Sequence, residues 1–313
     1  MTAKSPRDHF IAPHVALVLV QIMFGTWPIF GKLVLRSMSS TSLVGIRILG
    51  AAAVLTLLQR KLGQLRQLPK RVLAWLVLSS LLGVVLNQLL FVKGLSLTTA
   101  INATLLTTTI PVITLGVSIA LGYDGPSVRR FLGIALAAAG VIYLVDPWRA
   151  NFTSETTLGN VLILCSSLSY GAYIAVSRDL FRRYGALNVI TWIFVVGAIV
   201  SLPISAYAWS NEAWDISAGV WLIVPYIVLV PTVGAYYLNS WAITRVAPSV
   251  VAIYIYLQPL LSFGLAPLIL GETWNSRTLV ACALIFAGVA VVTIRSRSRA
   301  VEEVSEHPDA MAH

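Results

Sequence analysis

The sequence has few charged residues for its length. Only 11 % of its 313 residues are Asp, Glu, Lys or Arg, whereas 58 % are hydrophobic. A soluble domain carries about 25 % charged residues. Because so few charges cannot cover a water-facing surface, the composition excludes an ordinary soluble protein and predicts a chain that resides in a lipid bilayer.

Cysteine is also scarce. The two cysteines, Cys165 and Cys282, lie in separate apolar runs. This number and spacing exclude a disulfide framework. We expect both to be buried side chains that behave as small apolar residues.

Acidic and histidine side chains are missing from the middle of every apolar run. The four histidines are at positions 9, 14, 307 and 313, and none of the twelve carboxylates lies mid-run. The sequence has no HExxH motif. It therefore predicts no catalytic residues, no bound metal and no cofactor. A proton-coupled carrier needs an ionisable group inside the membrane. Asp124 and Glu272, at run ends, are the nearest candidates, so we predict a facilitator or an exchanger.

Long apolar runs, by contrast, fill most of the chain. A membrane-spanning helix needs about 20 apolar residues, and in lipid its backbone must satisfy its own hydrogen bonds. The sequence predicts ten such helices, at roughly 14–34, 41–59, 72–92, 98–122, 128–146, 157–177, 188–208, 217–240, 248–270 and 276–295. The predicted fold class is therefore an all-α integral membrane protein with ten transmembrane helices.

The net charge of +10 is distributed unevenly about these runs. On an alternating path that starts inside, sixteen Lys and Arg residues fall on the cytoplasmic side and five on the other. Cytoplasmic loops of membrane proteins carry this excess of positive charge. Both termini are therefore expected in the cytoplasm, and no nucleic-acid partner is expected.

The chain repeats itself. A shift of 148 residues superposes Pro111 on Pro259, Asp124 on Glu272 and Gly140 on Gly288, and a shift of 146 superposes Gly25 on Gly171. Each unit has five runs, an odd number, so the second must enter the membrane in the opposite sense, as an inverted repeat. The expected organisation is an N-terminal cytoplasmic tail (1–13), a first five-helix repeat (14–146), a loop (147–156), a second five-helix repeat (157–295) and a disordered cytoplasmic tail (296–313).

The chain resembles the drug/metabolite transporter superfamily and, within it, the ten-span EamA-type permeases. The resemblance covers about residues 14–295. It rests on Gly25 and Lys32, on Asn87-Gln88 with the following Phe91–Leu95, on Ala103 and Pro111, and on Ala252, Pro259, Leu270-Gly271-Glu272 and Gly288. The Asn87–Gly94 turn also resembles the plant-type branch, whose members move amino acids and related metabolites. The resemblance implies a monomeric carrier with a central cavity, usually working in efflux.

Neutral polar and aromatic side chains lie at mid-depth of several predicted helices, where polar groups are costly unless they face a cavity or a partner helix. We predict a substrate cavity, with the second repeat dominating substrate choice. Its predicted lining is Gln21, Trp27, Asn87, Gln88, Asn102, Tyr170, Tyr173, Tyr236, Asn239, Tyr254 and Gln258. The alternative is that these groups form hydrogen bonds between helices.

Three cations and three prolines complete the predicted site. Lys32 and Arg178 are equivalent under the 146-residue shift, and Arg47 lies about two turns inside its run. They could act as gates or substrate contacts, or they could anchor helix ends at the membrane surface. Prolines break helices locally. The predicted hinges, whose alternative role is a packing kink, are Pro28, Pro111 and Pro259.

These features predict a secondary transporter in a bacterial inner membrane or a plasma membrane. Its expected solutes are small organic metabolites, amino acids first and aromatic or amphipathic solutes among them, moved by alternating access in efflux or facilitated diffusion. Two alternatives remain. One is a nucleotide-sugar or phosphorylated-metabolite carrier, and the other is a membrane protein without transport activity, either an intramembrane enzyme or a scaffold.

Overall fold

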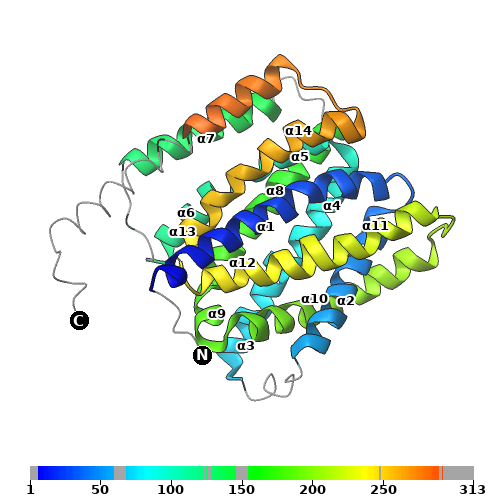
Figure 1. Ribbon diagram of the computed structural model, residues 1–313, viewed down its shortest axis with the longest axis horizontal. Helices are drawn as coiled ribbons and strands as arrows, with labels where there is room; N and C mark the ends of the chain where they lie inside the picture. Colours follow the sequence, from blue (N-terminus) through cyan, green and yellow to red (C-terminus); the bar gives the residue numbers. More distant parts are fainter. Residues whose placement is uncertain are drawn as a thin grey trace.

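The structure is a computed structural model that describes residues 6–59, 68–122, 125, 128–145, 154–246, 248–288 and 291. All secondary structure within these ranges is helical (Figure 1). The helices of the first half are α1 (Pro6–Val34), α2 (Ser40–Gln59), α3 (Lys70–Ser80), η2 (Leu81–Leu86), α4 (Asn87–Leu97), α5 (Ala100–Thr107), α6 (Ile110–Ala120) and α7 (Val128–Val145). Those of the second half are α8 (Glu155–Val176), α9 (Arg178–Tyr184), α10 (Ala186–Ser210), α11 (Ala218–Val228), η3 (Leu229–Gly234), α12 (Ala235–Ile243), α13 (Pro248–Ile253), η4 (Tyr254–Leu257) and α14 (Gln258–Leu270), followed by a helix at Ser276–Gly288.

Eight helical stretches are long and apolar enough to cross a bilayer. They are Ala12–Val34, Ser40–Gln59, Lys70–Leu97, Ala100–Ala120, Glu155–Val176, Ala186–Ser210, Ala218–Ile243 and Val250–Leu270. The predicted fifth run coincides with α7, and the tenth coincides with the shorter apolar helix Ser276–Gly288. The membrane protein fold is thus confirmed, whereas the number ten and the cytoplasmic placement of the termini stay predictions.

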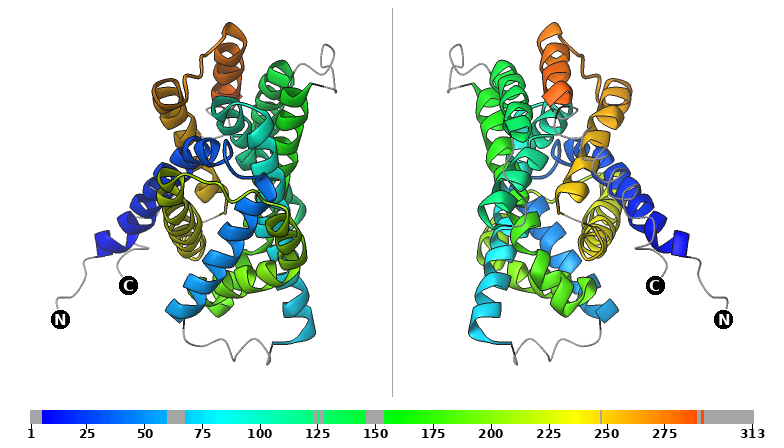
Figure 2. Two further views of the ribbon diagram at one scale, coloured as in Figure 1. Left: turned by 90° about the vertical axis from the view of Figure 1, so that its right-hand side faces the viewer. Right: turned by 90° about the vertical axis from the view of Figure 1, so that its left-hand side faces the viewer.

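The first and second halves pack in an interleaved way. α1 lies against α14 and α12, while α8 lies against α6 and α4, and α2 pairs with α10 (Figures 1 and 2). Glycines allow two of these approaches. A Cβ built on Gly25 would lie 2.7 Å from Leu261, and one built on Gly171 would lie 2.8 Å from Ile113. Since Ile113 and Leu261 are 148 residues apart, the two contacts are repeats of each other.

Irregular helical geometry recurs at the same interval. The π-helical segments Leu81–Leu86 and Leu229–Gly234 are separated by 148 residues. π-helical segments occur often at functional sites because they interrupt regular hydrogen bonding. The third helix of each half is therefore distorted at an equivalent depth.

The fourth helix of each half is broken at an equivalent place. In the first half, α5 ends at Thr107 and α6 begins at Ile110. In the second half, the 3-10 segment η4 separates α13 from α14. Pro111 and Pro259 lie in the first turn of the helices that follow, a position where proline loses no backbone hydrogen bond. Pro28 instead lies inside α1, which runs through it without interruption.

Some local expectations were wrong. The segment Asn87–Gly94, expected to form a turn, is helical, because α4 continues to Leu97 and the chain turns at Thr98 and Thr99. Cys165, expected to be buried, is exposed on the outside of the bundle, and Cys282 is half-buried. Large apolar side chains such as Leu57 and Leu268 are likewise exposed, which suits a surface in contact with lipid tails.

Part of the predicted organisation lies outside the described residues. This applies to residues 1–5, to 146–153 in the inter-repeat loop, and to the whole C-terminal tail from 296. Residues 6–13, expected in the N-terminal tail, form the first turns of α1. The repeat boundaries themselves stay predictions.

Candidate functional site

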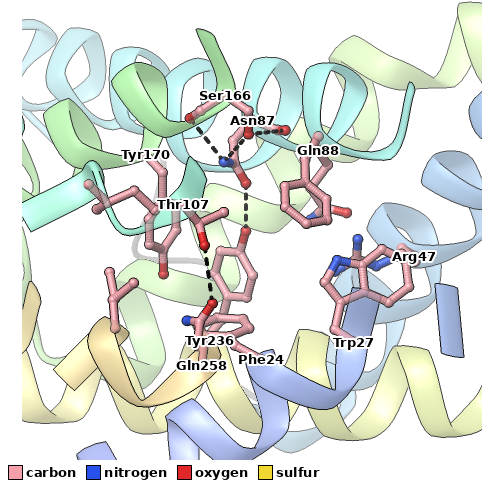
Figure 3. A pocket seen from close by; sticks show the side chains of 13 residues that line it. Phe24, Trp27, Arg47, Asn87, Gln88, Thr107, Ser166, Tyr170, Tyr236 and Gln258 are labelled. Carbon is pink, nitrogen blue, oxygen red and sulfur yellow. Dashed lines mark hydrogen bonds between the residues drawn. The ribbon is translucent and has the colours of Figure 1, made fainter. Parts of the chain in front are cut away.

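A cavity with a volume of about 60 Å³ lies among the irregular helices. Its lining comes from α1, α2, α4, α5, α6, α8, α12, η4 and α14 (Figure 3). The lining residues are Phe24, Trp27, Arg47, Asn87, Gln88, Phe91, Thr107, Ile110, Ser166, Tyr170, Tyr236, Ile255 and Gln258. An engineered cavity that holds benzene measures about 150 Å³, so the helices here lie too close together to admit an aromatic solute.

The cavity lies on the symmetry of the repeat. Eight of its lining residues form four equivalent pairs, one related by the 146-residue shift and three by the 148-residue shift. The pairs are Phe24 with Tyr170, Gln88 with Tyr236, Thr107 with Ile255 and Ile110 with Gln258. The cavity is therefore built where the two halves face each other.

A hydrogen-bonded chain of polar side chains forms one wall. Asn87 Nδ2 donates to Ser166 Oγ at 2.9 Å, and the Tyr236 hydroxyl lies 3.3 Å from Asn87 Oδ1 (Figure 3). The Tyr236 hydroxyl also donates to the carbonyl oxygen of Gly83 at 3.0 Å. Gly83 belongs to η2, so the π-helical distortion presents a backbone carbonyl to this wall.

Aromatic rings form a second part of the lining, which shares Tyr236 with the polar wall. Phe24 meets Tyr236 edge to face at a centroid distance of 5.7 Å, and Tyr170 meets Tyr236 in the same way at 6.0 Å. Trp27 lies 6.3 Å from Phe91. Edge-to-face contacts are a favoured geometry for aromatic pairs. These rings give the cavity an apolar, aromatic surface.

Arg47 is the charged member of the lining. It is 3 % exposed, and its guanidinium carbon lies 3.8 Å from the centroid of the Trp27 ring. Its Nε donates to Thr232 Oγ1 at 3.1 Å, and that hydroxyl donates in turn to the Ile227 carbonyl at 2.8 Å. The cation is therefore fixed in place by a ring face and one hydroxyl.

Gln88 is the polar group in the lining whose hydrogen bonds are missing. It is 1 % exposed, and neither Nε2 nor Oε1 has a hydrogen-bond partner of normal geometry among the described residues. Figure 3 shows it on the Arg47 side of the cavity. Buried polar side chains are nearly always paired, so an exception in a cavity wall indicates a place for a missing partner.

Six of the eleven residues predicted to bind substrate line the cavity. They are Trp27, Asn87, Gln88, Tyr170, Tyr236 and Gln258.

Three more lie directly behind the lining. Gln258 Nε2 donates to Gln21 Oε1 at 2.6 Å, and Asn239 Nδ2 donates to the Tyr170 hydroxyl at 3.3 Å. The Tyr173 ring lies 5.4 Å from that of Tyr170. These three side chains support the wall rather than form it.

The remaining two lie elsewhere. Tyr254 is half-buried and hydrogen-bonded to His14, with 2.6 Å between the Tyr254 hydroxyl and His14 Nδ1. Asn102 is near the start of α5, where its side chain approaches Thr98 and its backbone N–H is capped by Thr99. Each was expected on the cavity face because its helix was assumed to run unbroken.

Several lining residues were missed by the sequence reasoning. They are Phe24, Phe91, Thr107, Ile110, Ser166 and Ile255. The repeat carried a signal for two of them, because Phe24 is the symmetry partner of Tyr170 and Ile110 is that of Gln258, and both partners were predicted. The prediction considered polar and aromatic side chains at mid-depth and therefore passed over an apolar symmetry partner such as Ile110.

The other two candidate gating cations lie outside the cavity lining. Lys32 is in the last turn of α1, where Glu272 is near enough to act on it electrostatically. Glu272 itself accepts hydrogen bonds from the backbone N–H groups of Ala100 and Ile101. Arg178 begins α9. Asp124, the equivalent of Glu272, lies outside the described residues.

Comparison with known proteins identifies the class. The EamA-like transporter family matches residues 12–145 and again residues 157–294, so the chain belongs to this family and to the drug/metabolite transporter superfamily. It is a multi-pass cell membrane protein of the transporter type.

Two relatives illustrate the family. The chain is 25 % identical over 288 residues to the uncharacterized transporter YetK of Bacillus subtilis, covering 91 % of this chain and 87 % of YetK. It is 21 % identical over 320 residues to the WAT1-related protein At5g13670 of Arabidopsis thaliana, covering 90 % and 83 %. A solved crystal structure aligns with a TM-score of 0.61 at 20 % identity, over 94 % of this chain and 99 % of the other, and supports the fold alone.

Proposed function

We propose that this protein is a secondary carrier that binds small organic metabolites in the cavity between its two repeats. It releases them on the other side of the membrane by alternating access, in efflux or facilitated diffusion. Amino acids are the first class to consider, with aromatic and amphipathic solutes among them. The supporting observation is the position of the cavity, whose lining is paired by the repeat.

The irregular helices around the cavity support alternating access. In each half the third helix has a π-helical segment and the fourth is broken. Broken helices at mid-membrane are tolerated where they line a cavity, and inverted repeats can exchange shapes around such a site. The small cavity volume fits a closed conformation that must widen to accept a solute.

Counterflow in proteoliposomes tests the proposal. Vesicles loaded with an unlabelled amino acid, aromatic amine or sugar are diluted into the labelled form of the same solute. A carrier should accumulate label transiently above the level in protein-free vesicles for at least one solute. An absence of counterflow for every member of the panel would contradict the proposal.

A matched pair of variants ties transport to the cavity. Asn87→Leu removes the hydrogen bonds with Ser166 and Tyr236, and should lower counterflow about 10-fold or more. Leu268→Ala changes a side chain that is 82 % exposed on the outside of the bundle, and should transport like the parent protein. Equal transport by both variants would place the binding site elsewhere.

A phosphorylated-metabolite carrier has less support. Phosphate groups are bound by several cations acting together. Among the described lining residues Arg47 is the single cation.

A further inference from the structure

Arg47 is a buried cation that lacks an acidic partner. It is 3 % exposed, and among the residues that the structure describes it forms no ion pair. It lies seven residues inside α2, about 10 Å from the helix start at 1.5 Å per residue. Isolated charges are expensive to bury and are usually paired. A missing negative charge therefore needs an explanation.

The neighbouring groups compensate the charge only in part. The Trp27 face and the Thr232 hydroxyl account for the contacts of Arg47 in the described part of the chain. Its Nε is used, whereas the two terminal nitrogens, which carry four of the five guanidinium N–H groups, have no hydrogen bond there. A carboxylate matches the planar donor fork of a guanidinium in geometry as well as in charge.

Gln88 supplies a second, independent sign of a missing partner. Its amide is buried in the same cavity wall, close to the Tyr236 hydroxyl, and neither end forms a hydrogen bond of normal geometry. Both side chains line the cavity, and Figure 3 draws them on the same side of it. An anion held between them would accept from Nε2 of Gln88 and from the guanidinium.

The rest of the lining is suited to an uncharged body. No acidic side chain is among the described lining residues, so nothing there would neutralise a substrate ammonium group. Phe24, Tyr170 and Trp27 instead offer aromatic surface. A solute with a carboxylate at one end and an aromatic or apolar body thus fits better than a zwitterion.

We propose that the cavity is selective for organic monocarboxylates with an aromatic or apolar body, whose carboxylate binds Arg47 and Gln88, over amino acids and amines. This inference rests on the proposed transport function and, within small organic metabolites, ranks these carboxylates ahead of amino acids.

Binding to the purified full-length protein in nanodiscs tests the selectivity. The probes are 3-phenylpropionate, phenylalanine, phenethylamine and 3-phenylpropanamide, which share a ring and differ in their charged groups. Isothermal titration calorimetry should find 3-phenylpropionate bound about 10-fold tighter or more than each of the others, as expected for one charge-assisted hydrogen-bonding pair. Equal or tighter binding of phenylalanine or phenethylamine, or no binding of 3-phenylpropionate, would overturn the proposal.

Variants assign the selectivity to the two residues. Arg47→Gln should weaken 3-phenylpropionate about 10- to 100-fold and leave 3-phenylpropanamide within about 2-fold. Arg47→Lys, which keeps the charge but not the fork, should fall between. Equal weakening of all probes by Arg47→Gln would mean that Arg47 only supports the structure, and would overturn the proposal.

A second variant, Gln88→Leu, tests the site even if the Arg47→Gln protein does not fold. Gln88→Leu removes an amide that has no hydrogen bond to lose, so it should fold, and it should weaken 3-phenylpropionate about 3- to 10-fold. Unchanged binding in Gln88→Leu would remove Gln88 from the site and contradict the proposal. Leu268→Ala should bind every probe as the parent does.

Counterflow separates this proposal from the broader one. If solutes are transported but the carboxylate is not preferred, the carrier function stands and the anion selectivity falls. If 3-phenylpropionate binds in an Arg47-dependent way but no solute is exchanged, the anion site stands and the transport function falls.

Discussion

The carboxylate of Glu272 accepts a hydrogen bond from the backbone N–H of Ala100, with 2.7 Å between nitrogen and oxygen. Its second oxygen accepts from the N–H of Ile101 at 3.0 Å. A residue that follows α14 thus caps the first turn of α5, where a negative charge is favoured by the helix dipole. Glu272, the nearest candidate for a proton-coupling carboxylate, therefore already accepts two backbone hydrogen bonds in this conformation.

Glu272→Gln is therefore expected to weaken the fold and to leave the energy source of transport unchanged. An amide keeps one acceptor and loses the charge, which should cost about 1 kcal/mol. Thermal unfolding in detergent measures the loss, with Asp215→Asn, a change at an exposed carboxylate outside the helices, as the control. If wild-type transport requires a pH gradient and the requirement disappears in Glu272→Gln, the facilitator or exchanger assignment is wrong.

The stability of the loop after α10 should depend on pH through Glu212. Partial burial works to raise the pKa of this carboxyl, but hydrogen bonds from Ser39 Oγ and from the backbone N–H of Ser39 outweigh it and lower the pKa below the ordinary 4.5. A lowered pKa in the folded state stabilises the protein above the unfolded pKa, and the contribution is lost as pH falls through the folded value.

Glu212→Gln should thus be less stable than the parent at pH 7, and the difference should shrink as pH falls below about 4.5. Thermal unfolding from pH 7 to pH 3 measures this. Asp215→Asn, a change at a nearby exposed carboxylate, is the control and should show no such convergence. A difference between Glu212→Gln and the parent that stays constant with pH would disprove the role of the ionised carboxylate.

The interleaving of the halves can be tested at two equivalent glycines. Alanine at Gly25 would place its Cβ 2.7 Å from Leu261, and alanine at Gly171 would place it 2.8 Å from Ile113 and 3.1 Å from the Ile110 carbonyl oxygen. Overpacking of this kind costs about 1–3 kcal/mol. Both variants should melt at lower temperature, Gly171→Ala more so because a backbone atom is in the way.

Two other glycines serve as matched controls. Gly116 and Gly264 are related by the same 148-residue shift and have nothing within 4 Å of a built Cβ. Alanine there should be neutral or stabilising by up to about 1 kcal/mol, since alanine favours helix. If all four variants melt alike, close packing between α1 and α14 is not what limits stability.

The buried bond between Gln21 and Gln258 should be cooperative. Either Gln→Leu change alone leaves one buried amide without its partner, which costs about 1–3 kcal/mol. The double variant leaves neither and should lose less than the sum of the single changes. Chemical unfolding of the four proteins in a double-mutant cycle measures the coupling, and strict additivity would show that the bond contributes nothing.

The repeat was predictable from the sequence because it depends on residue identity at fixed intervals. The 148-residue shift recurs in the π-helical segments, the helix breaks and three pairs of lining residues. Apolar runs likewise predicted the helices to within a few residues, since the length of a membrane span follows from the thickness of the bilayer.

The cavity lining was only partly predictable, because the helices are apolar on nearly every face. Periodicity then says little about which side of a helix points inward. Asn102 and Tyr254 lie outside this lining: Asn102 follows the turn at Thr99, and Tyr254 begins the 3-10 segment η4. The expected dominance of the second repeat also differs from the lining, in which Arg47, Asn87 and Gln88 all come from the first.

The sequence alone determined that this chain is a membrane protein with two related halves, because hydrophobic length and internal repetition are properties of the chain order. Tertiary structure alone decided that Arg47 lies on Trp27 with no acidic partner among the described residues, and that Gln88 lines the same cavity without a hydrogen bond of normal geometry. Whether a buried polar group is satisfied depends on atoms brought from distant helices, and no local pattern encodes those partners.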